Sequence, residues 1–174
     1  MTYRIAKPKE ADVIAQLHAE SWRTAYKDIL KQEYLDGEML QDRLAVWRAR
    51  FNNPKGNQHI IVAAEKGEIK GFVCIFGNDN AQWGALVDNL HVSPALKGRG
   101  IGKKLMEQAA LWVCKNYPNS GLYLWVYKAN SGAIAFYEKI GGENVECVLH
   151  ENPGGGEANV LRYVWTNIDF LMNT

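Results

Sequence analysis

One glycine-rich stretch constrains this chain more than any other. Residues 86–92 hold enough apolar and β-branched side chains for a strand, and Pro94 ends that strand because proline cannot donate to a sheet ladder. From Ile101 onward the apolar positions recur at helical spacing, so the glycines within residues 98–102 lie between a strand and the start of a helix. The first turn of a helix has backbone N–H groups without internal partners, and these groups favour an anion.

The composition of this turn favours a pyrophosphate. Glycine allows a positive φ and has no Cβ to keep a phosphate away from the backbone donors, and the turn also carries four cations, Lys97, Arg99, Lys103 and Lys104. A mononucleotide P-loop is excluded because Lys104 stands where that motif needs Ser or Thr for magnesium. A dinucleotide fingerprint is disfavoured because the glycine spacing differs and the turn lies in mid-chain.

The same turn resembles the acetyl-CoA signature of the GNAT superfamily of N-acetyltransferases, Q/R-x-x-G-x-G/A, with Lys97 at the Q/R position. Lysine keeps the positive charge there but lacks the planar fork of arginine. The resemblance implies that acetyl-CoA is the co-substrate and that its pyrophosphate lies on Lys97, Gly98, Arg99, Gly100, Ile101, Gly102 and Lys103. It also implies that backbone N–H groups near Leu90, His91 and Val92 polarise the thioester carbonyl.

Residues 130–142 form a second motif. Asn130 is a predicted helix N-cap, and Gly141 is a predicted stop at the other end of a helix with one apolar face. The segment resembles the GNAT pattern N-x-x-A-x-x-F-Y-x-x-x-G-F, with Gly142 in place of phenylalanine. By that resemblance Asn130 binds the pantetheine arm and Tyr137 is the acid at the thioester sulfur. A cap alone and a core aromatic are the structural alternatives for these two residues.

The remaining segments predict the order of the other elements. These are a short strand at 3–6, a helix from Asp12, a second helix at about 34–51, strands at 59–65 and 69–76 joined as a hairpin, a turn at 77–82, a helix at 100–116, a strand at 122–127 apolar on both faces, and strands at 144–150 and 158–165 around a flexible tip. The strand at 122–127 is expected to pair in parallel with the one ending at Val92.

The fold class that follows is α/β (α+β), GNAT-like. We expect a mixed, mostly antiparallel sheet of six to seven strands, flanked by about four helices, with a splay between the two central parallel strands. Residues 1–174 are expected to form a single N-acetyltransferase domain, since no linker or repeat is visible.

Several side chains are candidates for handling the acceptor. Trp22 and Tyr26 lie four apart on one helical face, which fits either an acceptor pocket or ordinary packing. Asp88, on the strand before the glycine turn, is a candidate base and acceptor ligand; its alternatives are a salt bridge or a strand-end hydrogen bond. Glu20, or no side-chain base at all, are the other options for the base. His18 lies in an apolar stripe and is expected to be a core histidine.

Composition narrows the function further. A net charge of +1 and a pI near 7.7 argue against a nucleic-acid partner. The three widely spaced cysteines suggest neither a disulfide framework nor a metal site, and no apolar run reaches membrane-spanning length, so a cytoplasmic protein without a membrane partner is expected. The family resemblance adds a homodimer as an expectation.

The predicted function is transfer of acetyl from acetyl-CoA to a primary amine of a small molecule or peptide, by direct attack. The alternative is a non-catalytic acyl-CoA-binding sensor or interaction module on the same fold. Tyr137 beside Asn130 favours the enzyme, because a pure binder needs no acid at the sulfur.

Overall fold

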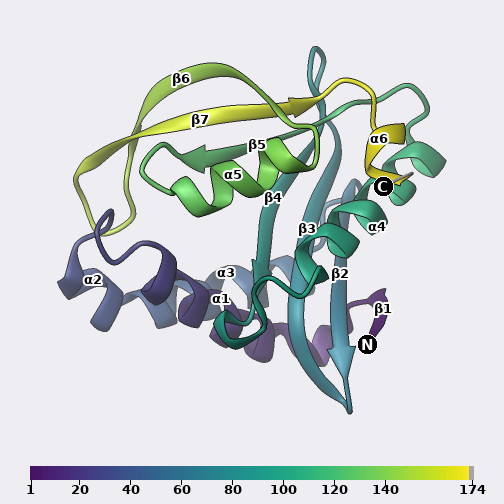
Figure 1. The fold of residues 1–174 in the computed structure, drawn as a ribbon. Helices are drawn as coiled ribbons and strands as arrows, with labels where there is room; N and C mark the ends of the chain where they lie inside the picture. Colours follow the sequence, from purple (N-terminus) through teal and green to yellow (C-terminus); the bar gives the residue numbers. More distant parts are fainter. Residues whose placement is uncertain (173–174) are drawn as a thin grey trace.

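Seven strands form one sheet in the order β1-β2-β3-β4-β5-β7-β6 in the computed structural model, which describes residues 1–172 (Figure 1). All neighbouring strands are antiparallel except β4 and β5. The strands are β1 (Thr2–Ile5), β2 (Gln58–Glu65), β3 (Glu68–Asn80), β4 (Gly84–Val92), β5 (Leu122–Tyr127), β6 (Glu143–Glu151) and β7 (Glu157–Trp165). The helices are α1 (Ala11–Ala25), α2 (Gln32–Asp36), α3 (Met39–Asn52), α4 (Ile101–Asn116), α5 (Ser131–Lys139) and α6 (Asp169–Met172). The predicted GNAT-like fold class is confirmed.

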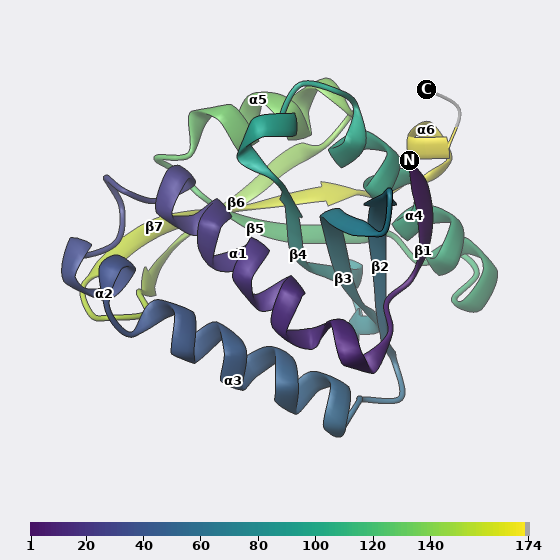
Figure 2. The same cartoon turned by 90° about the horizontal axis from the view of Figure 1, so that it is seen from below.

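Helices cover both faces of the sheet. Alternate side chains of a strand point to opposite faces, so Val62 and Phe72 pack against α1 and α3, while Ile61 and Val73 pack against α4. Seen from below, α1 and α3 lie on one side of β2, β3 and β4, and α5 lies on the other side (Figure 2). The sheet is therefore the common wall between two apolar cores.

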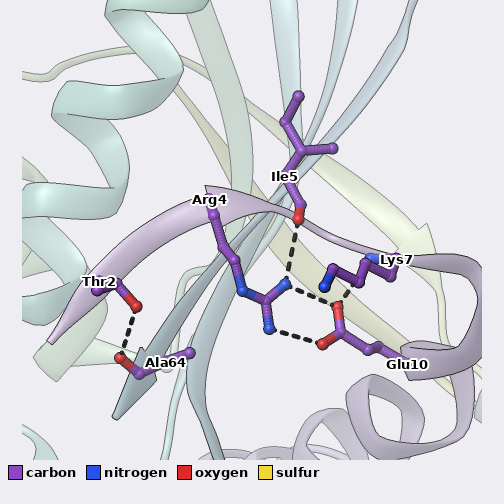
Figure 3. Close-up of polar contacts among 6 residues, drawn as sticks. All are labelled: Thr2, Arg4, Ile5, Lys7, Glu10 and Ala64. Atoms are coloured by element: carbon purple, nitrogen blue, oxygen red, sulfur yellow. Dashed lines mark hydrogen bonds and ion pairs between the residues drawn. The ribbon is translucent and has the colours of Figure 1, made fainter. Parts of the chain in front are cut away.

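A short hydrogen-bonded turn connects β1 to α1. Figure 3 shows the Arg4 guanidinium donating to both carboxylate oxygens of Glu10, at 3.0 and 2.7 Å. Glu10 also accepts from the backbone N–H of Lys7 at 2.7 Å. These bonds fix where α1 leaves the edge of the sheet, and so where α1 crosses the face.

The two parallel strands separate soon after they meet. Only Ala85 with Leu122 and Leu86 with Tyr123 are paired between β4 and β5, and beyond them Figure 1 shows β5 turning away from β4. A register shift against β3 leaves Asp88 without a partner residue, which makes a bulge at the point of divergence. The predicted splay is confirmed.

Three local predictions were wrong. The helix predicted at 34–51 is two helices, α2 and α3, because Gly37 interrupts it with non-helical backbone. β3 continues to Asn80 instead of ending at Phe76, since Asn78 takes a positive φ of 49° within an irregular stretch that the strand accommodates. β5 is not buried on both faces, because Trp125 is 37% exposed on the side away from α5.

Candidate active site

The glycine loop, residues 97–103, joins the 3-10 turn Pro94–Leu96 that follows β4 to the first turn of α4. Gly98 and Gly100 have φ values of +80° and +78°, and a Cβ on either would meet no atom within 4 Å. Their glycine identity thus keeps the backbone conformation and the open space above it. Gly102 has a packing role as well, because a Cβ there would lie 3.4 Å from the Phe136 ring.

The donors and cations of this loop are free for a ligand. No side chain caps α4, and the backbone N–H of Lys104 is the first to bond back, to the Gly100 carbonyl at 3.0 Å. Lys104 pairs with Glu107, whereas no ion pair within residues 1–172 includes Lys97, Arg99 or Lys103. A polyanion such as a pyrophosphate fits this combination of open N–H groups and unpaired charge.

The edge of β4 facing the splay offers backbone groups. Leu90, His91 and Val92 pair with β3 on one side, but on the β5 side they have no strand partner among the described residues. Leu90 and Val92 direct their side chains toward the core under α4, whereas His91 packs on Phe72 on the opposite face. The splay therefore exposes main chain, as a hydrogen-bonding thioester or amide ligand requires.

Asn130 and Tyr137 belong to α5 and its N-cap, which follow β5, the strand across the splay from β4. Asn130 Oδ1 accepts from the backbone N–H of Ala133 at 3.2 Å, so the predicted cap is confirmed. Tyr137 is 8% exposed and packs against Tyr163 and Trp165, and burial raises its pKa. Its hydroxyl consequently keeps its proton at neutral pH.

An aromatic wall, made of Trp22, Tyr26 and Tyr127, joins the end of α1 to the end of β5. The Tyr26 ring centroid lies 5.4 Å from that of Trp22 and 5.0 Å from that of Tyr127. The pKa of Tyr26 is raised by burial and by its neighbours Tyr137 and Tyr127, so the three phenols converge. Trp22 and Tyr26 are thus packed against each other, as the packing alternative predicts, and their acceptor role stays a prediction.

Asp88 is held in place by α3. Its Oδ2 lies 2.6 Å from Arg50 Nη2, and the same guanidinium donates to Asn89 Oδ1 at 2.8 Å. The salt bridge that the sequence left as an alternative is present. A carboxylate acting as a base from this position gives up an ion pair as it takes the proton.

A histidine pair lies beneath the aromatic wall. His18 is completely buried, and its Nδ1 accepts from Trp47 Nε1 at 3.0 Å, which confirms it as a core histidine. The ring of His91 lies 4.3 Å from it, with Nδ1 3.0 Å from Ser21 Oγ. Burial lowers the pKa of both rings, that of His91 to about 3. Both are neutral at pH 7.

Sequence reasoning missed Arg43 of α3, as it missed Tyr127 and Arg50. The guanidinium carbon of Arg43 lies 4.6 Å from the centroid of the Trp22 ring. No motif surrounds it, and a lone cation on a helix is ordinarily a solvated surface residue. Its position is visible only once α3 is folded against α1.

Neither a metal-binding cluster nor a membrane-spanning helix is present in the part of the chain that the structure describes. No group of three or more His, Cys, Asp or Glu side chains within residues 1–172 is placed to hold a metal ion. Over the same residues, no helix is both long enough and apolar enough to cross a bilayer.

Comparisons with known proteins agree with this geometry. YuaI of Bacillus subtilis, described as an uncharacterized N-acetyltransferase, is 30% identical over 149 residues, which is 83% of this chain and 82% of that protein. A 5-NmdU N-acetyltransferase of Pseudomonas phage PaMx11 is 34% identical over 166 residues, covering 93% and 97% of the two chains. The PaiA N-acetyltransferase of Thermoplasma acidophilum, solved in complex with coenzyme A, has the same fold, with a TM-score of 0.70, 19% identity, and coverage of 94% and 98%. Residues 14–142 match the sequence profile of the acetyltransferase (GNAT) family. The chain therefore belongs to the GNAT family and is an acetyltransferase.

Proposed function

We propose that residues 1–174 work as a single domain that transfers acetyl from acetyl-CoA to a primary amine by direct attack. The observation that carries the proposal is the splay: one strand edge with free backbone groups, a glycine loop at one end of it, and three phenols opposite. An extended thioester ligand with a pyrophosphate at its far end fits this arrangement.

The residues that would hold acetyl-CoA follow from the geometry. The backbone N–H groups of the glycine loop, with Lys97, Arg99 and Lys103, face the pyrophosphate. The pantetheine arm then runs along the open edge of β4 toward Asn130, whose amide nitrogen is not used by its cap to Ala133. When bound, acetyl-CoA supplies an activated acyl group, and the protein supplies position and polarity.

The acyl carbonyl gains negative charge as an amine attacks it. A backbone N–H on the segment 90–92 can donate to that oxygen without having to reorganise, because the strand is held by β3 on its other side. Tyr137 donates a hydrogen bond to the departing sulfur. Its raised pKa means that the proton is retained until the sulfur has taken up charge.

The amine must lose a proton before it attacks. Of the three options, Asp88, Glu20 and no side-chain base, we favour the last. Asp88 is occupied by Arg50, and Glu20 is exposed on α1. The acceptor then loses one proton to water before it binds as the neutral amine, and its nitrogen releases a second proton to water as the amide forms.

The alternative function, a non-catalytic acyl-CoA sensor, keeps the glycine loop and needs no Tyr137. The relatives named N-acetyltransferases support the enzyme instead, and the phage relative is named for 5-NmdU as its acceptor. Both functions require acetyl-CoA to bind.

Thermal unfolding with and without acetyl-CoA tests the proposal, with ATP as control. A ligand at 100 times its Kd adds about 2.7 kcal/mol to the free energy of unfolding. We expect a clear rise in Tm with acetyl-CoA and none with ATP, followed by thiol release when amines are added. A rise in Tm without thiol release for any amine would favour the sensor, and no rise would overturn both functions.

A further inference from the structure

Outside the glycine loop, Arg43 is the arginine whose guanidinium has no carboxylate or backbone carbonyl partner within residues 1–172. Of the seven arginines in the sequence, four form ion pairs with carboxylates, Arg4, Arg48, Arg50 and Arg162. Arg23 donates to the Leu35 carbonyl, and Arg99 belongs to the glycine loop. Within residues 1–172 no ion pair or hydrogen bond to a carboxylate is made by Arg43, and its Nε is buried without a hydrogen-bond partner.

The position of this cation makes its lack of a partner informative. The side chain is half-buried, so water satisfies only part of its guanidinium. It lies over Trp22, and it acts electrostatically on Tyr127 and His91, which border the splay. The neighbouring carboxylate of Asp42 is taken by the Tyr34 hydroxyl at 2.9 Å. An unpaired charge thus stands at the aromatic wall, on the acceptor side of the splay.

We infer that Arg43 binds a carboxylate of the acceptor, so that the acceptor is a small amine that also carries a carboxylate, as a free amino acid does. The inference rests on the proposed function and adds the class of acceptor. A guanidinium presents parallel N–H donors that match the two oxygens of a carboxylate. The aromatic wall would take the apolar part of such a molecule, with the amine directed toward the β4 edge.

The test compares amines that differ only in the carboxylate. The pairs are leucine with isoamylamine, phenylalanine with phenethylamine, and γ-aminobutyrate with propylamine, assayed by thiol release from acetyl-CoA. We expect kcat/KM to be about 10- to 100-fold higher for the carboxylated member of at least one pair, which is the range of a charge-assisted hydrogen bond. Phosphoethanolamine against ethanolamine separates a carboxylate site from a phosphate site.

Substitution at Arg43 assigns the preference to this residue. In Arg43→Gln the preference should vanish through a higher KM for the carboxylated amine, while the decarboxylated amine changes by less than about twofold; Arg43→Lys should retain part of it. Arg48→Gln is the matched control, because Arg48 lies on the same helix but is paired with Asp12 at the surface. Unchanged Tm and acetyl-CoA affinity in Arg43→Gln exclude a folding defect.

Several outcomes overturn the inference and leave the proposed function standing. One is equal or better use of the decarboxylated amines by the unmodified protein. A second is an equal loss for both members of a pair in Arg43→Gln, and a third is a preference found only for the phosphate. If no carboxylated amine is acetylated, the inference is also overturned. The acetyl-CoA shift in Tm, measured separately, then decides whether the proposed function falls with it.

Discussion

The two sides of the splay are built from different parts of the polypeptide. On the coenzyme side, one run of seven consecutive residues, 97–103, supplies backbone donors, conformation and charge. On the acceptor side, Trp22, Arg43 and Tyr127 come from α1, α3 and β5, and they meet only through tertiary packing. The comparison indicates that the coenzyme site is fixed locally, whereas the acceptor site depends on how three elements are placed.

The largest effect is expected from a substitution that changes the backbone of the glycine loop, on the coenzyme side. Gly100→Val introduces a side chain at a φ of +78° and fills the open space above the loop. We expect acetyl-CoA affinity to fall about 100-fold or more, because the N–H donors no longer converge on one phosphate. Isothermal titration calorimetry measures the change.

Gly67→Val is the matched control for that substitution. Gly67 lies in the β2–β3 turn with a φ of +86°, and its added Cβ also meets no atom within 4 Å. Both variants therefore share a backbone cost of about 1–2 kcal/mol. If Gly67→Val weakened acetyl-CoA binding as much as Gly100→Val, the effect would come from general destabilisation and not from the loop.

The same contrast explains what could be predicted from the sequence. The glycine loop and the Asn130 cap are contiguous motifs. The structure has the loop and the helix cap at the residues that the sequence predicted. The break at Gly37 was missed because apolar residues recur at helical spacing on both sides of it. A Cβ on Gly37 would lie 2.8 Å from the Glu33 carbonyl oxygen, so the glycine itself was the available signal.

Partners that are distant in the sequence could not be predicted at all. The ion pair of Asp88 with Arg50 depends on α3 crossing the face of the sheet above the β4 bulge. The insertion of β7 between β5 and β6 depends on the order in which strands pair, which no local pattern encodes. The homodimer expected from the sequence stays a prediction.

The second expected effect concerns the acceptor side, which lies on the neutral His18–His91 pair. Burial lowers the pKa of both histidines below the ordinary value of 6.5. As pH falls below 6.5, these two histidines therefore bind protons in the unfolded chain but stay neutral in the folded chain. Stability is therefore fully present above pH 6.5 and is lost as pH falls toward the folded pKa values. We expect each histidine to contribute a loss of about 2 kcal/mol in the free energy of unfolding between pH 6.5 and 4.5, measured by urea denaturation.

Cationic neighbours also lower the pKa values of the two histidines, which favours the expected loss of stability in acid. Arg43 and Arg50 both lower the pKa of His18, and Lys97 lowers that of His91. His91→Asn removes one of the two titrations, so its loss over the same pH range should be smaller by about half. An identical pH dependence in the variant would show that the pair does not control acid stability.

A smaller effect is expected at Tyr137, which stands between the two sides. Tyr137→Phe removes the hydroxyl that donates to the departing sulfur and leaves the ring packing with Trp165 intact. We expect kcat to fall about tenfold with little change in the KM for acetyl-CoA. Steady-state kinetics measures both constants.

Tyr163→Phe provides the comparison for the Tyr137 variant. The Tyr163 hydroxyl donates to Glu138 at 3.0 Å, so this variant loses a hydrogen bond next to Tyr137 but none at the splay. It should lower Tm without lowering kcat. A normal kcat in Tyr137→Phe would remove Tyr137 from the chemistry.

The smallest effect is expected at Asp88, the carboxylate that the sequence placed nearest the reacting groups. Asp88→Asn keeps a hydrogen-bond acceptor for Arg50 and removes the charge. Loss of a general base costs about 100-fold or more in rate, whereas loss of an anchoring ion pair shifts a strand edge slightly. We expect kcat to fall less than about tenfold, with an unchanged pH–rate profile. A large fall in kcat together with loss of the acidic limb of the profile would restore Asp88 as the base. In that case the carboxylate of Asp88, at the β4 bulge, would react with the acceptor. The same strand, β4, would then supply the base and lead into the glycine loop that binds the coenzyme.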